Sequence, residues 1–423
     1  MNNILFVGHD IEYLNFYMNI SNNFKNTNSF HAYIRPSAEL YSKLINNNTL
    51  NLITSRFKEF DFCNKNLLQV NDLKFYTNGF EDQIREKEFI LLFNKYIKVL
   101  DEFIIKNEIN KIVTSGEYRL FEQAVIHCAK KNKIELIFFE AGPPGYVYFD
   151  KNGVNANVIF KSRNKKSEIS DDSFKKKETL SNFISFKKNE IFKKLFIIFE
   201  VLYLFLLLFF NYMIDYIEYY QALKNRIIKY SIFLKSKFLK FKKTKIISRI
   251  DEEFFYFLYL DQVKSDVNYT HFSNFNNSEN MLHDFLNDNV NNHIKWRFHP
   301  LQKQSRLYDS ISKKFPEQVT VDNSNSLREL ILGCQAGITV NSNAGLECLS
   351  YGKKLLLLGD SYYECCKGVM KDYRDLIKQT DSNDIIDDYN KFLSENFLSI
   401  DYRNSKFDKG LMLKLGDYFE NEI

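Results

Sequence analysis

Short apolar runs alternate with amphipathic stretches along the first 157 residues or so of the chain. Uninterrupted apolar runs predict buried strands, and apolar positions that recur at the helical period predict helices. The predicted strands are residues 4–7, 111–114 and 136–139, and the predicted helices are residues 86–106 and 121–132. Strands that alternate with helices are typical of a parallel sheet covered by helices.

The same alternation returns in the last third of the chain, from about residue 249 to the C-terminus. The predicted strands there are residues 254–260, 294–298, 318–321, 337–340 and 354–358. A second sheet of this length is a second domain rather than an extension of the first, because 423 residues exceed the usual size of one core. The pattern therefore predicts an α/β chain with two Rossmann-like domains facing a cleft.

The segment between the two α/β parts has a different composition. Residues 195–210 are almost wholly apolar and are broken only by Glu200, and lysines flank them. From residue 161 to 250 the chain has 21 Lys and Arg against 8 Asp and Glu, a local charge of +13 within a formal net charge of +5. We predict three parts: an N-terminal Rossmann-like domain over residues 1–160, a helical basic and apolar insert over 161–248, and a C-terminal Rossmann-like domain over 249–423.

The insert is expected to lie on a membrane surface. Buried Phe and Leu with Lys near anionic headgroups would hold such helices at the cytoplasmic face of the inner membrane, each charge contributing roughly 1 kcal/mol. Two alternatives stay open, namely a helical hairpin packed on the protein itself and a true membrane span. A span would separate the two α/β parts, and an apolar run of this kind has no role on nucleic acid.

The cysteines and the N-terminal residues bear only on the cellular compartment that we expect for the protein. The six cysteines contain no C-x-x-C pair, so neither a zinc site nor a disulfide framework is expected. The chain begins directly with an apolar strand ending in Gly8-His9-Asp10, without the basic region of a secretion signal. A cytoplasmic protein, peripheral on the inner membrane, is therefore expected.

Small polar residues follow the predicted strand at 337–340. A strand that leads through such residues into a helix presents backbone N–H groups and a positive dipole end to a phosphate. The residues of this candidate phosphate site are Asn341, Ser342, Asn343, Gly345 and Glu347. The alternative is an ordinary Asn or Ser helix cap.

Two other strands of the second domain end in residues able to do chemistry. Gln262 and Asp266 follow the strand at 254–260, and Arg297, His299 and Pro300 end the strand at 294–298. Open α/β sheets bind ligands at the carboxyl ends of their strands. Asp266 could act as nucleophile or base, with His299 or Arg297 neutralising a leaving phosphate. Taken singly, Asp266 is also explained as a solvated loop acid.

Two acids of the first domain also follow strands. Glu117 and Glu140 are candidates for the acid or base that acts on an acceptor hydroxyl, and helix capping or turn formation is the alternative for each. The chain has no Walker loop, no G-x-G-x-x-G fingerprint, no G-x-S-x-G elbow and no Asp-x-Asp pair after a strand. A transfer without a metal or a cofactor is expected.

Taken together, these segments resemble the capsule polysaccharide β-Kdo transferases, which use CMP-Kdo, the activated form of an eight-carbon acidic sugar. The blocks that carry the resemblance are residues 140–150 with 153–155, 256–262 with Asp266, His271 and Ser273, 297–300, and 341–347 through 352 to 359–363. They cover about residues 110–160 and 250–365 and leave out the insert.

The resemblance implies a GT-B-like fold in which the C-terminal domain binds the nucleotide sugar and the N-terminal domain binds the acceptor. It also implies retention of configuration through a carboxylate nucleophile, for which Asp266 is the matching residue. His299 would contact the CMP phosphate, His271 and Gln262 would belong to the donor site, and Asn341 to Asn343 with Glu347 would surround phosphate and ribose.

The function expected from the sequence is transfer of Kdo or a related acidic sugar from a CMP-sugar to a lipid or lipid-linked glycan in capsule synthesis. Capsule assembly or export proteins are candidate partners, and nucleic acid is not. One alternative is a CDP-polyol phosphotransferase of the teichoic-acid kind, which would need no carboxylate nucleophile at Asp266. Another is a scaffold without catalytic activity in a capsule export complex.

Overall fold

The structure is a computed structural model of the 423-residue chain. It describes residues 2–34, 38, 42, 49–51, 86–161, 255–263, 266–300, 302, 305–377, 382–403 and 407–421. The predicted insert at 161–248 lies outside these residues except for Lys161. None of the helices in the described ranges is long and apolar enough to cross a membrane.

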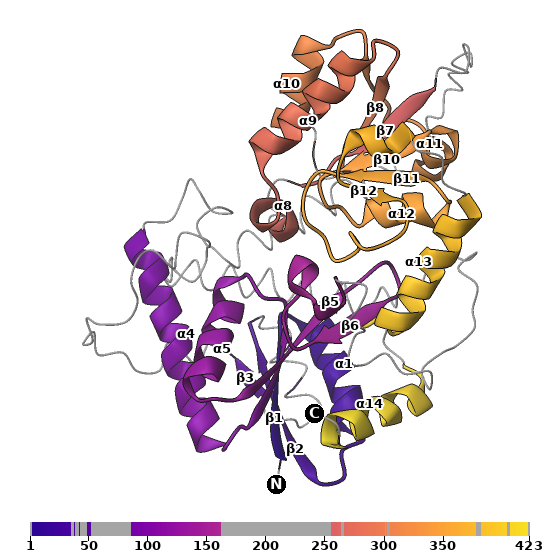
Figure 1. Ribbon diagram of the computed structural model, residues 1–423. Helices are drawn as coiled ribbons and strands as arrows, with labels where there is room; N and C mark the ends of the chain where they lie inside the picture. Colours follow the sequence, from indigo (N-terminus) through magenta and orange to yellow (C-terminus); the bar gives the residue numbers. More distant parts are fainter. Residues whose placement is uncertain are drawn as a thin grey trace, which may run out of the picture. The chain divides into compact units, whose positions relative to one another are not determined.

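The described residues divide into two compact units. Unit 1 holds those from 2 to 154 and those from Asn396 onward, and unit 2 holds those from 155 to Glu395. Each unit is built around one six-stranded sheet with helices packed on it (Figure 1). The chain therefore has the two α/β parts that the alternating pattern predicts.

Unit 1 begins with a strand that becomes the centre of its sheet. Its elements are β1 (Asn2–Gly8), α1 (Ile11–Ser21), β2 (Thr27–Tyr33), β3 (Thr49–Asn51), α4 (Glu86–Lys106), β4 (Lys111–Ser115), α5 (Leu120–Lys131), β5 (Glu135–Ala141), β6 (Val147–Asp150) and, near the C-terminus, α14 (Lys409–Asn421). The strand order is β3-β2-β1-β4-β5-β6, and every pair is parallel except β5 with β6. This is the Rossmann order, in which the direction of winding reverses between β1 and β4.

Both faces of this sheet are buried, which explains why its strands read as continuous apolar runs. On β1, Leu5 and Val7 pack into the core beneath α4 and α5, whereas Ile4 and Phe6 pack with residues of α1 and α14. Successive side chains of a strand point to opposite faces, so one apolar run supplies both cores. Figure 1 shows α4 and α5 on one side of β1 and β4, with α1 and α14 on the other.

The C-terminal segment corrects one predicted boundary. The sequence pattern assigns residues 249–423 to a single domain, but the residues from Asn396 onward belong to unit 1. Leu398 pairs with Val147 through two backbone hydrogen bonds of 2.8 and 3.0 Å. The Glu420 carboxylate accepts the backbone N–H of Lys25 at 2.8 Å. These contacts close the face of the first sheet that α1 alone leaves partly open.

Unit 2 contains a second sheet of the same order. Its elements are two short 3₁₀ turns (Asn155–Asn157 and Ile159–Lys161), β7 (Tyr256–Leu260), α8 (Val267–His271), α9 (Phe275–Asp288), β8 (His293–Arg297), α10 (Arg306–Lys314), β9 (Val319–Val321), α11 (Leu327–Gly333), β10 (Ala336–Thr339), α12 (Ala344–Ser350), β11 (Lys354–Leu357), β12 (Val369–Met370), a 3₁₀ turn (Tyr373–Ile377) and α13 (Ser382–Asn396). The order is β12-β11-β10-β7-β8-β9, with all pairs parallel. Winding reverses between β7 and β10.

The core of unit 2 is centred on two stacked aromatic rings. Tyr259 of β7 and Trp296 of β8 lie with ring centroids 3.6 Å apart at an interplanar angle of 19°, and both are at most 1% exposed. Neighbouring parallel strands place these rings side by side. The stack holds β7 and β8 firmly, and these two strands carry the candidate residues Gln262 and His299 at their carboxyl ends.

The prediction of an α/β chain with two Rossmann-like units is confirmed by the two sheets. Predicted strands 4–7, 111–114 and 136–139 lie within β1, β4 and β5, and the predicted helix 86–106 coincides with α4. That the two units face a cleft stays a prediction.

Candidate functional site

The predicted site residues gather at the points where the strand order reverses. In unit 2, Gln262 and Asp266 follow β7, and Asn341 follows β10, its neighbour in the sheet. In unit 1, Glu117 follows β4, the neighbour of β1, and Glu140 lies near the end of β5. In open α/β sheets the crevice at such a reversal is where ligands bind.

Asp266 is the N-cap of α8 and is largely buried. Its Oδ1 accepts the backbone N–H of Asn268 at 2.8 Å. Desolvation by burial raises the pKa of Asp266, while the N–H of Asn268, the Gln262 side chain and the nearby charge of His299 oppose the rise. The alternative interpretation of Asp266 as a loop acid is narrowed to a helix cap, because the residue is the partly buried N-cap of α8.

Three amide side chains, at the ends of β7 and β10 and on α8, have buried oxygens. Gln262 Oε1, Asn268 Oδ1 and Asn341 Oδ1 accept no hydrogen bond from the residues that the structure describes. Gln262 is 5% exposed and Asn341 is 2% exposed. Buried polar atoms are nearly always hydrogen-bonded, and each one left without a donor costs about 1–3 kcal/mol. The ends of β7 and β10 thus present buried acceptor oxygens for which the described residues supply no donor.

Asn341 also fixes the short helix that Asp266 caps. Its Nδ2 donates to the backbone oxygens of Asn268 at 2.7 Å and of Phe272 at 3.4 Å. The side chain therefore ties the β10 end to α8 rather than extending away from the sheet. Sequence analysis places Asn341 at a phosphate, and the structure gives it this bridging position beside Asp266.

The other residues of the predicted phosphate cradle make local bonds. Ser342 Oγ accepts the N–H of Ala344 at 3.2 Å, and Asn343 Oδ1 accepts the Tyr362 hydroxyl at 2.9 Å. The Tyr363 hydroxyl donates to the Ser342 backbone oxygen at 2.6 Å. The N-cap of α12 is Asn343, which makes no side-chain cap bond, and Ser342 Oγ instead accepts the first N–H of the helix; a phosphate at this loop stays a prediction.

Gly345 and Glu347 belong to α12, the short helix that this loop begins. A Cβ on Gly345 would lie 2.7 Å from Leu355 Cδ2, so glycine lets α12 pack tightly on β11. Burial raises the pKa of Glu347. Gly345 thus has a packing role that the pattern did not reveal.

The residues at the end of β8 and just after it have different contacts. Arg297 Nη1 donates to the backbone oxygen of Asp322, 3.3 Å away, so its guanidinium secures the loop after β9. Its backbone oxygen accepts the N–H of Asp261 at 3.0 Å. His299 instead acts electrostatically on Asp266, and Pro300 is exposed. His271, at the end of α8, has its Nδ1 2.9 Å from the Thr270 hydroxyl.

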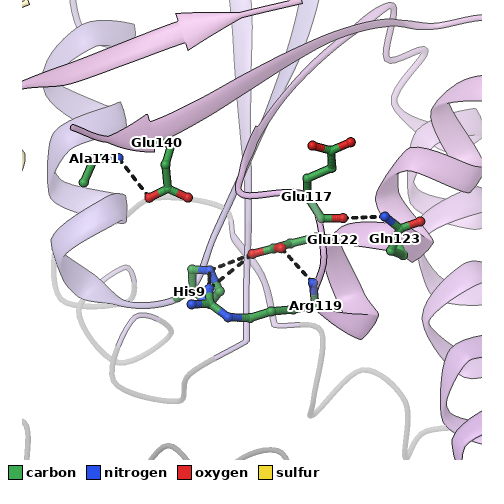
Figure 2. Close-up of polar contacts among 7 residues, drawn as sticks. All are labelled: His9, Glu117, Arg119, Glu122, Gln123, Glu140 and Ala141. Carbon is green, nitrogen blue, oxygen red and sulfur yellow. Dashed lines mark hydrogen bonds and ion pairs between the residues drawn. The ribbon is translucent and has the colours of Figure 1, made fainter. Parts of the chain in front are cut away.

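In unit 1 the carboxylate of each predicted acid accepts a hydrogen bond from a backbone N–H. Glu117 Oε2 accepts from Val154 at 3.1 Å, and Glu140 Oε1 accepts from Ala141 at 2.9 Å. Figure 2 shows the Glu140 carboxylate turned back on the chain that follows it, while the Glu117 carboxylate points away from His9. The turn-forming alternative thus accounts for part of what both residues do.

A third acid of unit 1 was missed by the sequence analysis. Glu122, in the first turn of α5, is 2% exposed, and its Oε1 lies 2.9 Å from His9 Nε2 and 3.2 Å from Arg119 Nη1 (Figure 2). His9 directly follows β1 and Arg119 follows β4, so the three meet where the sheet reverses. Gly8-His9-Asp10 at the end of a predicted strand was the signal that could have found this group.

The turn before α5 is shaped around the Glu122 carboxylate. Gly116 has φ +84°, and a Cβ there would lie 2.5 Å from Glu122 Oε1. The other oxygen, Oε2, accepts the Arg119 backbone N–H at 2.9 Å and completes a capping box. Burial raises the pKa of Glu122, and the Arg119 guanidinium opposes that rise.

Glu122→Gln is expected to alter how stability depends on pH. Because its pKa in the folded chain lies above the ordinary 4.5, the folded state holds a proton that the unfolded state releases. The stability contributed by Glu122 is therefore full below that value and falls as pH rises through the folded-state pKa. Glutamine keeps the capping box and does not titrate, so the stability of the variant relative to wild type should increase as pH rises from 4.5 through the folded-state pKa of Glu122. Thermal melts across this range give the measurement, and a constant difference would contradict the assignment.

Several known proteins are similar to this chain. The solved structures include Thermosulfurimonas dismutans KpsC, beta Kdo 2,7 transferase, at 12% identity over 76% of this chain and 88% of that chain, with a TM-score of 0.34. The beta Kdo 2,4 transferase of the same KpsC matches at 13% identity over 66% and 79%, with a TM-score of 0.34. UDP-N-acetylglucosamine 2-epimerase from Rickettsia bellii matches at 11% identity over 100% and 99%, also at 0.34.

A search of curated proteins finds no match. The family model described as capsule polysaccharide biosynthesis protein matches residues 110–395, which is well over half of the 423 residues and includes Glu117, Glu140, Asp266, His299 and Asn341. The chain belongs to the capsule polysaccharide biosynthesis protein family.

Proposed function

We propose that the chain is a retaining glycosyltransferase that moves Kdo or a related acidic sugar from a CMP-sugar onto a lipid or lipid-linked glycan in capsule synthesis. The observation that carries the proposal is the group at the reversal point of unit 2. Asp266, whose carboxyl is desolvated, follows β7 there, and Gln262, Asn268 and Asn341 have buried side-chain oxygens with no donor among the described residues. Membership of a capsule polysaccharide family supports the product class.

The acceptor oxygens favour a ligand rich in hydrogen-bond donors. A cytidine base carries an exocyclic amine, and a ribose and a ketosugar carry several hydroxyls. Each such donor would satisfy a buried oxygen that otherwise costs about 1–3 kcal/mol. Gln262 and Asn341 are the residues that we assign to this recognition, because both are nearly fully buried.

Asp266 is assigned as the nucleophile. Its carboxylate oxygen bonds to the anomeric carbon of the sugar as the bond from that carbon to the CMP phosphate oxygen breaks, and CMP leaves with the electron pair. Desolvation favours this step because the bond formed removes the buried negative charge. The acceptor oxygen then displaces the carboxylate, so two inversions retain the configuration. His299, which already acts on Asp266 electrostatically, is placed to offset charge on the leaving phosphate.

Unit 1 is proposed to take the acceptor, and the basic segment to bring the chain to it. A local charge of +13 over residues 161–250 favours the anionic cytoplasmic face of the inner membrane, where a lipid-linked acceptor would be anchored. Capsule assembly or export proteins are possible partners at the same surface. The proposal uses no metal.

Donor turnover by the wild-type protein tests the proposal. With CMP-Kdo and a lipid-linked acceptor, CMP should be released in step with a sugar-extended acceptor, whereas CDP-glycerol should be left intact. CMP should also raise the melting temperature, because a ligand that binds only the folded state stabilises it by about 2.7 kcal/mol at a hundred times its Kd. Consumption of CDP-glycerol instead of CMP-Kdo would establish a polyol phosphotransferase. Binding of neither nucleotide would favour the scaffold.

A further inference from the structure

Three hydrogen-bond donors hold the Asp266 carboxyl in unit 2. They are the backbone N–H groups of Asn268 and Tyr269 and the side chain of Gln262. The two N–H groups belong to α8, the short helix that Asp266 itself caps, whereas Gln262 follows the end of β7. Among these three donors, Gln262 is therefore the one that ties the carboxyl to the sheet.

The position of Gln262 is fixed independently of Asp266. Its backbone N–H donates to Asp261 Oδ1 at 3.0 Å, and the Asp261 N–H donates to the backbone oxygen of Arg297 at 3.0 Å. Gln262 is also only 5% exposed, so packing limits the directions that its side chain can take. The amide that meets Asp266 is thus held by β7 and β8.

The bond to Asp266 decides which way the Gln262 amide faces. A carboxylate accepts hydrogen bonds, so Nε2 points to it, and a flipped amide would bring two acceptor oxygens together. Gln262 Oε1 is then left without a donor among the described residues. Asn341 has the same disposition, because its Nδ2 donates to the Asn268 carbonyl oxygen at 2.7 Å and its Oδ1 lacks a donor there.

A structural role explains only the nitrogen end of the Gln262 amide. Holding Asp266 requires the N–H donor, but it gives no reason to bury an acceptor oxygen that no described residue satisfies. Such an oxygen destabilises the folded chain until a donor reaches it. In the proposed transferase the sugar of the donor substrate lies against Asp266, so its hydroxyl groups are the donors nearest to Oε1.

We propose that Gln262 positions the nucleophile and also binds a hydroxyl group of the donor sugar, so that a correctly seated sugar orients the Asp266 carboxylate. This inference rests on the proposed function and deepens it. The sugar hydroxyl donates to Oε1 while Nε2 keeps its bond to Asp266. A carboxylate oxygen then bonds to the anomeric carbon, the bond from that carbon to the CMP phosphate oxygen breaks, and CMP leaves with the electron pair.

The pKa of Asp266 gives a test that needs no substrate. The Gln262 N–H stabilises the charged carboxylate and so lowers the pKa of Asp266, and Gln262→Met should therefore raise that pKa. Carbon-13 NMR of protein labelled at its aspartate carboxyls gives the measurement, and the signal is the one missing from Asp266→Asn. His299 also acts on the carboxyl, but it is present in both proteins, so the difference between them reports Gln262.

Two variants separate the two ends of the amide. Gln262→Glu keeps an acceptor oxygen and loses the N–H donor, whereas Gln262→Met loses both. Single-turnover release of CMP from CMP-Kdo should slow by about a hundredfold in both variants, the cost of a misdirected nucleophile. The half-saturating concentration of CMP-Kdo should rise about tenfold in Gln262→Met alone, because only that variant loses the contact with the sugar. CMP, which has no such sugar, should raise the melting temperature equally in all three proteins.

Gln318→Met is the matched control. Gln318 precedes β9, at the opposite edge of the same sheet, and its Nε2 donates to the backbone oxygens of Leu286 and Asn292, both at 3.1 Å. Losing these bonds should lower the melting temperature while the pKa of Asp266 and the release of CMP stay as in wild type. A purely structural role of Gln262 would give the same result in Gln262→Met.

Each part of the proposal can be overturned separately. An unchanged pKa of Asp266 in Gln262→Met would exclude the positioning role, whatever the activity. A half-saturating concentration within about twofold of wild type in that variant would exclude the contact with the sugar. If the wild type released no CMP from CMP-Kdo, the proposed function would be refuted together with the sugar contact, and the pKa comparison would still decide whether Gln262 holds Asp266.

Discussion

Asp266→Asn is expected to abolish sugar transfer while the fold survives. Replacing the carboxylate removes the atom that bonds to the anomeric carbon, and a loss of about a thousandfold or more corresponds to about 4 kcal/mol of transition-state stabilisation. Asparagine caps helices as well as aspartate does, so the bond to the Asn268 N–H at 2.8 Å can be kept. The substitution also removes a desolvated charge, so the melting temperature should not fall.

The measurement combines turnover, intact mass and melting. The variant should release no CMP above background and carry no sugar, while wild type shows both the product and the adduct. Asp322→Asn is a suitable control, because Asp322 also follows a strand of the same sheet and accepts the N–H groups of Ser324 and Asn325 at 3.0 and 3.2 Å. Its transfer rate should stay near that of wild type.

Transfer by Asp266→Asn within about tenfold of wild type would exclude Asp266 as the nucleophile, since so small a loss is about 1.4 kcal/mol. An unmodified wild-type protein that nonetheless transfers sugar with inversion would do the same. Either result would favour a single displacement, in which the acceptor hydroxyl attacks the anomeric carbon of the donor directly.

Strands such as β4 and β11 could be predicted because they are buried on both faces. Such strands appear as apolar runs whatever their neighbours, as the runs at 111–114 in β4 and 354–358 in β11 show. Four strands were not predicted: β2 is largely polar in its first half, and β3, β6 and β12 have only 3, 4 and 2 residues. Their pairing depends on the finished sheet.

The candidate site of unit 2 could be predicted because carboxyl ends of parallel strands share one edge. That rule brings Gln262, Asp266 and Asn341 together without knowledge of any contact. It does not say which way each side chain turns. Asn341 donates to the carbonyls of α8, and Arg297 donates to the loop after β9, because those backbone oxygens lie within reach only once the loops are folded.

The contact between His9 and Glu122 in unit 1 could not be predicted, for another reason. His9 and Glu122 are far apart in the sequence, and they meet because β1 and β4 are neighbours in the sheet. A strand order of this kind follows from how the helices cross, which the apolar pattern leaves open. Glu122 by itself looks like an ordinary residue of a helix start, and only its burial beside His9 distinguishes it.

The second large predicted effect is a loss of stability of unit 1 when a buried residue of the C-terminal helix α14 is replaced. Phe419 of α14 is fully buried, with its ring 6.0 Å from that of Phe6 and 5.2 Å from that of Phe149. Its backbone oxygen accepts from Lys111 Nζ at 3.3 Å. Phe419→Ala should therefore destabilise unit 1 by about 3–5 kcal/mol, the cost of removing a buried aromatic ring and leaving a cavity.

Because the two units can unfold separately, a single unfolding free energy is not the best measurement. Hydrogen exchange of the β1 amides reports on unit 1 alone, and it should accelerate strongly in Phe419→Ala while the β7 amides of unit 2 exchange as before. Leu413→Ala, on the same helix but at a side chain 46% exposed, should change neither by more than about 0.5 kcal/mol. If the two variants behaved alike, α14 would not be part of the unit 1 core. If β7 responded instead, the assignment of residues from Asn396 onward to unit 1 would be wrong, because the chain's end would then stabilise unit 2.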